Sequence, residues 1–201
     1  MELLMEHGGD VTAGLTPPIV EAAQEGSFET VEFILSKCKT IPKNQLTSAL
    51  VFAADCGQKN VVELLIKNGV DVNAYYEGTT GLMRAARNDY LEIAQVLIAA
   101  GADVNKRTED NDATAVSSAC AEGNIEMVQL LLKNGADPYI ELKDGNSCLF
   151  EASRNGNSEL VSLLIHFSKT GNLSDSMRTS TNIPKTKQKG FFKKTQRKTS
   201  C

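Results

Sequence analysis

Short apolar runs recur along the chain at a nearly constant distance. They occupy residues 33–35, 64–66, 96–98, 130–132 and 163–165, so successive runs begin 31, 32, 34 and 33 positions apart. Around the third run, Leu91, Ala94, Leu97 and Ile98 fall at positions i, i+3, i+6 and i+7, which share one face of an α-helix. A self-similar period near 33 residues is typical of solenoids, in which each repeat buries its apolar face against its neighbours.

Three further markers keep the same register. A pair of small residues precedes each apolar run: Ala22-Ala23, Ala53-Ala54, Ala85-Ala86, Ala119-Cys120 and Ala152-Ser153. A turn residue stands between the pair and the run: Gly26, Gly57, Asp89, Gly123 and Gly156. A closing Gly-x-Asp turn begins at Gly8, Gly69, Gly101 and Gly135. We therefore expect two helices per repeat, the first kept thin by its small residues so that neighbouring repeats pack closely.

The ends of these helices carry their own signals. Hydroxyl residues precede the first helix of four repeats and are predicted N-caps: Ser48, Thr80, Thr114 and Ser147. Gly69, Gly101 and Gly135 follow the second helix, where a left-handed residue lets the chain turn away. The polar segments 105–113 and 139–146 are predicted to be hairpin-like loops that project from the stack.

The combined pattern resembles the ankyrin repeat. The consensus sequence of that repeat corresponds here to Thr80-Gly81-Leu82-Met83-Arg84-Ala85-Ala86, followed by Leu97-Ile98-Ala99-Ala100-Gly101-Ala102-Asp103-Val104-Asn105. The resemblance implies an all-α ankyrin-repeat solenoid of about five repeats, near 12–42, 43–74, 75–107, 108–141 and 142–168. We predict a partial repeat at 1–11, an ankyrin domain at 12–170 and a disordered basic tail at 171–201, because the tail is too polar to bury a core.

The amino-acid sequences of some segments resemble those of a narrower family, the large scaffolds that combine many ankyrin repeats with a single KH domain. Segments 18–26, 82–87 and 142–147 carry this similarity. It implies a role in cytoplasmic and nuclear signalling, including co-activation of transcription, and an RNA-binding KH module downstream. It also implies that this chain is a slice of a longer array, in keeping with its start inside a repeat.

Charge is divided along the chain. Residues 171–201 contain eight Lys or Arg and one acid, a net charge of +7, whereas the other 170 residues contain 13 basic and 24 acidic groups, a net charge of −11. The basic run 185–198 could be a nuclear-import signal, a contact for nucleic acid or another acidic surface, or a solvated tail. It could also fold back onto the acidic body. Phosphate contacts need Lys and Arg, so we expect no nucleic-acid binding by the repeat domain.

The resemblance implies that protein partners bind the concave face, formed by loop tips and the exposed ends of the first helices. Carried onto this sequence, the protein-binding candidates are Tyr76, Glu77, Thr79, Arg87, Asn88, Glu109, Asp110, Glu122, Lys143, Asp144, Asn146, Arg154 and Asn155. Tyr76 is the favoured anchor, since exposed tyrosines are enriched in binding hot spots. Asn73 and Asn105 close Asp-Val-Asn turns, and the resemblance implies possible hydroxylation of both by an intracellular dioxygenase.

Other chemistry finds no support in the sequence. The segment 78–81 matches the Gly-x-x-Gly loop of KH domains, but it lies at a repeat boundary where Thr80 caps a helix. The five cysteines are widely spaced with no Cys-x-x-Cys pair, and no phosphate-binding loop or nucleophile context is present. We therefore predict no catalytic, metal or cofactor site and no membrane association.

The predicted function is a non-catalytic protein-interaction scaffold, cytoplasmic, nuclear or both, of undetermined oligomeric state. Two alternatives stay open: a nucleic-acid-associated factor that uses the basic tail or a KH domain outside this chain, and an adaptor portion of a larger enzyme.

Overall fold

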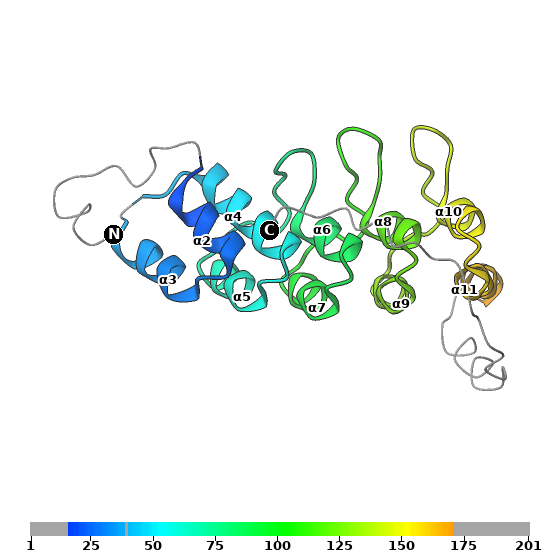
Figure 1. Cartoon of the computed structure of the whole chain (residues 1–201). Helices are drawn as coiled ribbons and strands as arrows, with labels where there is room; N and C mark the ends of the chain where they lie inside the picture. Colours follow the sequence, from blue (N-terminus) through cyan, green and yellow to red (C-terminus); the bar gives the residue numbers. More distant parts are fainter. Residues whose placement is uncertain (1–15, 39, 171–201) are drawn as a thin grey trace.

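A computed structural model describes residues 16–38 and 40–170 of the chain. Their regular elements are helices arranged in pairs along one axis (Figure 1). In chain order they are α2 (Pro18–Glu25), α3 (Phe28–Lys37), α4 (Lys43–Asp55), α5 (Lys59–Lys67), α6 (Gly81–Arg87), α7 (Leu91–Ala99), α8 (Ala115–Glu122), α9 (Ile125–Lys133), α10 (Cys148–Arg154) and α11 (Ser158–Thr170). The all-α solenoid predicted from the sequence is confirmed.

The even-numbered helices form an inner row and the odd-numbered helices an outer row. Each inner helix packs against the next inner helix and against the outer helix of its own repeat. The alanine pairs sit in the inner row, where Ala53, Ala54, Ala85 and Ala86 are fully buried. Side chains this small allow helix axes to approach to roughly 8–10 Å, so successive repeats stack tightly.

The predicted caps are confirmed in three repeats and wrong in one. The hydroxyls of Thr80, Thr114 and Ser147 accept hydrogen bonds from the backbone N–H three residues on, at 3.4, 3.3 and 3.3 Å. Ser48 instead lies inside α4, where its Oγ donates to the Gln45 carbonyl at 3.0 Å. The reason is Pro42, whose fixed φ suits the position directly before a helix, so α4 starts at Lys43, six residues earlier than a Ser48 cap indicates.

The turn between the paired helices needs a left-handed backbone. Gly123 ends α8 with φ 81°, and the equivalent residue after α6, Asp89, has φ 63°. A residue with a Cβ is strained there, although Asp tolerates it better than most. Partial burial raises the pKa of the Asp89 carboxyl, and the nearby charge of Glu126 raises it further.

The domain boundaries stay predictions. The partial repeat at 1–11 and the basic tail at 171–201 lie outside the described residues. Within the described part, Cys38, Cys120 and Cys148 are free thiols. No helix in that part combines the length and the apolar character needed to cross a bilayer.

The last repeat exposes a face that earlier repeats bury. Leu82 and Val116 are 1% and 0% exposed because the next inner helix covers them, whereas Leu149, at the equivalent position of α10, is 42% exposed. Phe150 is 49% exposed, although its counterparts Met83 and Ser117 are buried. The stacking interaction, rather than the helix itself, therefore supplies the burial.

This contrast predicts two different costs for the same truncation. Leu82→Ala removes a side chain packed on all sides and should lower the free energy of unfolding by about 2–5 kcal/mol. Leu149→Ala should lower it by less than about 1 kcal/mol, because most of the side chain already faces solvent. Urea unfolding followed by far-UV circular dichroism would measure both, and equal losses would contradict this account.

Asp89→Asn should stabilise the protein at pH 7. A carboxyl whose pKa is raised on folding opposes folding once it is ionised, so the wild type loses stability as the pH rises above the unfolded value and through the raised one. The gain should be a few tenths of a kcal/mol, since solvent screens an exposed side chain, and it should vanish at acid pH. Asp112→Asn is the control: Asp112 also has positive φ (60°), but it pairs with Arg107 at 3.9 Å and should gain nothing.

Candidate protein-binding groove

Three loops project from the inner row, before α6, α8 and α10 (Figure 1). We name them the first finger (residues 76–79), the second finger (108–113) and the third finger (142–146). Each is closed by a backbone hydrogen bond: Tyr76 N–H to the Thr79 carbonyl at 2.9 Å, Thr108 to Ala113 at 2.7 Å, and Leu142 to Asn146 at 2.9 Å. In the first finger Glu77 and Gly78 both have positive φ (49° and 70°), as a two-residue hairpin turn requires.

Adjacent fingers are hydrogen-bonded to each other. The Glu109 N–H donates to the Gly78 carbonyl at 3.3 Å, and the Lys143 N–H donates to the Asn111 carbonyl at 3.1 Å. The Lys143 ammonium also donates to the carbonyls of Glu109 and Asp110, at 3.1 and 2.7 Å. These bonds hold the three fingers in one register, so they act as a continuous wall.

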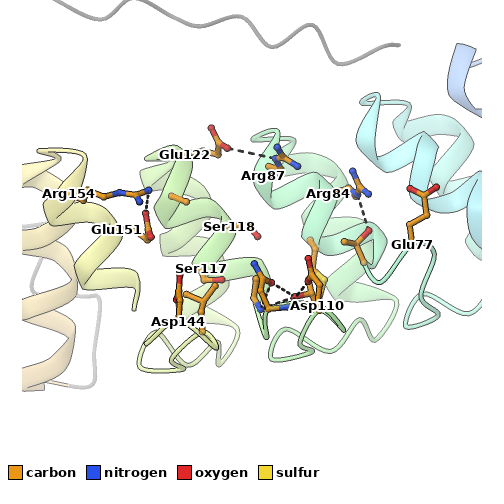
Figure 2. Close-up of a pocket in the computed structure, with 17 residues that line it drawn as sticks. Glu77, Arg84, Arg87, Asp110, Ser117, Ser118, Glu122, Asp144, Glu151 and Arg154 are labelled. Atoms are coloured by element: carbon orange, nitrogen blue, oxygen red, sulfur yellow. Dashed lines mark hydrogen bonds and ion pairs between the residues drawn. The ribbon is translucent and has the colours of Figure 1, made fainter. Parts of the chain in front are cut away.

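A groove of about 490 Å³ lies between this wall and the inner helices. Its floor contains short side chains of α8, among them Ser117, Ser118 and Ala121. The fingers contribute Glu77, Asp110 and Asp144, and α6, α8 and α10 contribute charged residues on the other side (Figure 2). The groove spans the third, fourth and fifth repeats, and we name it the finger groove.

The arginines in the finger groove are paired with carboxylates. Arg84 Nη1 lies 3.9 Å from Asp55, and its Nε donates to the Thr79 hydroxyl at 2.9 Å. Arg87 lies 3.8 Å from Glu122, and Arg154 lies 2.5 Å from the buried Glu151 (Figure 2). The helix side of the groove is therefore largely neutralised by its own ion pairs.

The finger side keeps its negative charge. A hydrogen bond from the Thr108 side chain, followed by one from the Asn111 backbone, lowers the pKa of the Asp110 carboxyl. Asp144 accepts bonds from the backbone and side-chain N–H groups of Asn146, at 3.0 and 2.8 Å. These bonds orient both carboxylates, and the nearby charge of Lys143 also contributes to lowering the pKa of Asp110.

The finger groove brings together seven of the thirteen predicted binding residues. They are Glu77, Thr79, Arg87, Asp110, Glu122, Asp144 and Arg154. Their role in binding stays a prediction, but their shared location is a structural fact.

The other six do not line this groove, and several hold the scaffold together. Asn88 donates to the carbonyl and carboxylate of Asp55, each at 2.9 Å, and Asn155 donates to the Ala121 carbonyl at 2.7 Å. Glu109 and Lys143 join neighbouring fingers, and Asn146 braces its own finger. Tyr76 was expected to be exposed, but it is half-buried, with its ring centroid 5.4 Å from that of Phe52.

The list of predicted residues missed part of the groove. Arg84, Ser118 and Glu151 each stand four residues after a capping hydroxyl, and Arg87, Ala121 and Arg154 stand three residues further on. These positions lie on one helix face. Counting from Thr80, Thr114 and Ser147 would therefore have found the helix side of the groove directly.

Asn73 and Asn105 join the closing turns of neighbouring repeats. The Asn73 amide donates to the Gly101 carbonyl at 3.0 Å and accepts from the Asp103 N–H at 2.7 Å. Asn105 makes the same two bonds one repeat later, to Gly135 at 3.0 Å and from Asp137 at 2.8 Å. Their hydroxylation stays a prediction. The described residues contain no group of three His, Cys, Asp or Glu side chains that could hold a metal ion.

Stacked helix pairs with projecting hairpins and a groove between them define a helical-repeat solenoid of the kind used for macromolecular recognition. The model of the family described as ankyrin repeats (3 copies) matches the chain over residues 1–76, 19–108 and 82–176. The chain belongs to the ankyrin repeat family.

Relatives of known name include two nematode proteins. Ankyrin repeat and KH domain-containing protein mask-1 of Caenorhabditis elegans is 50% identical over 173 residues, and protein CBG24701 of Caenorhabditis briggsae, of the same description, is 43% identical over 173 residues. Each match covers 86% of this chain, but this chain spans only 7% and 6% of those relatives. Probable E3 ubiquitin-protein ligase XBOS33 of rice is 30% identical over 77% of this chain and 31% of its own length. The likeness to ankyrin and KH scaffolds seen in the sequence is confirmed.

Asn105→Ala should lower the free energy of unfolding by about 1–2 kcal/mol, because two hydrogen bonds between repeats are lost at about 0.5–1.5 kcal/mol each. Asn60→Ala is a suitable control, since Asn60 is exposed on α5. Denaturant unfolding of both variants would measure this loss in the free energy of unfolding. If the two variants unfold at the same midpoint as the wild type, Asn105 does not join the repeats in solution.

Proposed function

We propose that this chain is a non-catalytic interaction module that binds partner proteins in the finger groove. The observation that carries the proposal is a single groove spanning three repeats, with one wall held by hydrogen bonds between fingers. Preorganised walls favour binding because little conformational entropy is lost when the partner docks.

The shape and chemistry of the groove suit a polypeptide partner. The floor of short side chains leaves room for a main chain, and the walls offer carboxylates, arginines, hydroxyls and amides for its polar groups. Interfaces of this kind typically mix direct hydrogen bonds with bridging water. Leu142 and Met83 add apolar contact at the two sides.

The absence of catalysis is part of the proposal. Arg87 and Arg154 pair with Glu122 and Glu151. Ser117 Oγ donates to the Thr114 carbonyl at 3.0 Å, so its proton is committed to a helix cap. This arrangement serves recognition rather than nucleophilic chemistry. The name of the rice relative describes that longer protein as a probable ubiquitin ligase. If this chain were the substrate-binding part of such an enzyme, the substrate would bind in the same groove.

We further propose a scaffold role in cytoplasmic or nuclear signalling, or in transcriptional co-regulation. The similarity to proteins named for ankyrin repeats and a KH domain supports it. A second candidate is a nucleic-acid-associated factor, favoured by the eight basic residues of 171–201. Deleting 171–201 separates the two, because it should abolish nucleic-acid binding and leave protein partners bound.

Ala121→Trp tests the groove directly. Ala121 is an exposed groove residue of α8, and a tryptophan there would fill the floor without touching the buried core. Proteins captured by the immobilised full chain should be depleted about tenfold or more by this variant, since a steric block removes most contacts at once. Quantitative mass spectrometry of matched pull-downs measures the depletion.

Ala99→Trp is the matched control, because Ala99 is equally exposed on the outer helix α7. Its captured set should equal that of the wild type. Capture that survives in Ala121→Trp would place the binding surface elsewhere and overturn the proposed function.

A further inference from the structure

Two cysteines face each other where the fourth and fifth repeats meet. Cys120 lies in α8 and Cys148 is the first residue of α10, and both are free thiols buried in the stack, at 0% and 1% exposed. A side-chain hydrogen bond with Cys148 raises the pKa of the Cys120 thiol, and burial raises it further. The two thiol groups therefore point toward each other across the junction between the repeats.

The fold sets the separation of these two positions. Cys120 is the second small residue of its inner helix, as Ala54 is in α4. Cys148 is the first residue of the next inner helix, as Gly81 is in α6. A Cβ atom added to Gly81 would lie 3.5 Å from the Cβ of Ala54. Disulfide-bonded cysteines have Cβ atoms about 3.5–4.5 Å apart, so neighbouring inner helices bring these positions to the separation that a disulfide needs.

The stacking of repeats does not itself require sulfur at these positions. At two earlier junctions the same pair of positions holds Ala54 with Gly81 and Ala86 with Ala115. Small size is therefore the property that the close approach of the helices depends on. The thiols of the last junction add a chemical property that the earlier junctions lack.

The last repeat gives an oxidant a route to the pair. The thiolate is the reactive form of cysteine, so buried and protonated thiols react slowly while the stack is closed. Among the described residues, however, α10 packs closely against one inner helix, α8, and its Leu149 and Phe150 are 42% and 49% exposed. Elements that pack on one side open locally more often than those packed on both. Local opening of α10 exposes both thiols, and they meet again when the helix closes.

We propose that Cys120 and Cys148 form a redox-sensitive site, at which hydrogen peroxide converts the two thiols into a disulfide that joins the fifth repeat to the fourth. One thiolate attacks a peroxide oxygen and the O–O bond breaks, which gives a sulfenic acid and a hydroxide that takes up the thiol proton as water. The second thiol then attacks the sulfenic sulfur, the S–O bond breaks, and a second water leaves. The two cysteines lose two electrons and two protons in total, and the peroxide is reduced to two waters.

The cross-link would act at the base of the third finger. Cys148 directly follows Ser147, the residue that caps α10 after this finger, and Cys120 directly precedes Ala121 in the groove floor. A disulfide restricts the opened state, because the two residues can no longer move apart. The fifth repeat would therefore stay docked on the fourth, whatever the finger groove binds.

The test treats the folded full chain with hydrogen peroxide, blocks the remaining thiols and maps disulfides by mass spectrometry. Trypsin places the two cysteines in separate peptides, residues 108–133 and 144–154. We expect these peptides to appear joined, with the loss of two hydrogens, as the main new disulfide. Hydrogen exchange of the α10 amides should then become slower by about tenfold or more, as expected for a cross-link that closes a loop of this length.

Three single variants are matched controls. Cys120→Ala and Cys148→Ala place alanine where Ala86 and Ala115 stand one junction earlier, so both variants should fold. Peroxide should leave hydrogen exchange in α10 unchanged in both. Cys38→Ala removes another free thiol of the described residues and should form the disulfide as the wild type does.

Oxidised wild type without the joined peptides would overturn the proposal. So would a disulfide that forms only at urea concentrations that unfold the whole chain, because oxidation would then not proceed through opening of α10. Formation of the disulfide with no slowing of exchange in α10 would show that it does not hold the repeats together, and would overturn the proposal as well. None of these outcomes bears on the finger groove, which Ala121→Trp tests separately.

Discussion

The close approach of the inner helices is the constraint on which the rest of this structure depends. Ala53, Ala54, Ala85 and Ala86 are fully buried between α4, α6 and α8. A larger side chain at these positions would push the repeats apart and break the hydrogen bonds between fingers, because backbone bonds tolerate only a few tenths of an ångström of stretch. The recognition wall is thus a consequence of small residues in the core, and Ala85 and Ala86 stand in α6 directly between the groove residues Arg84 and Arg87.

Side-chain amides extend this constraint across the stack. Asn88, Asn124 and Asn155 each donate to backbone carbonyls of the preceding inner helix, at 2.7–3.2 Å. Asn73 and Asn105 make the corresponding bonds between closing turns. Carbonyls at helix ends have no partner within the helix, so an amide from the next repeat satisfies them and sets the register of stacking. Amides here belong mainly to the scaffold, whereas charged residues belong mainly to the groove.

The sequence predicted the period, the helix pairs and most caps because these depend on local signals that recur in every repeat. A prediction failed where two local signals competed. Ser48 is a good capping residue, but α4 begins before it, directly after Pro42. The half-burial of Tyr76 follows from contact with Phe52, a residue 24 positions away, and no local pattern reports that contact. Asparagine is usually found at the surface, so the sequence around Asn88 and Asn155 indicates exposed residues. Only the stacked structure shows that they donate hydrogen bonds to the neighbouring repeat.

The groove divides its charge in a way that bears on selectivity. On the helix side, Arg87–Glu122 and Arg154–Glu151 neutralise each other, so a partner gains little from this side through charge alone. On the finger side, the bonds from Thr108, Asn111 and Asn146 hold carboxylates in fixed directions while leaving their charge intact. Discrimination between partners depends on the difference in their interaction energies. Carboxylates held in fixed directions create that difference more effectively than mobile ones, because a mismatched ligand cannot recover its lost contacts by rearranging the wall.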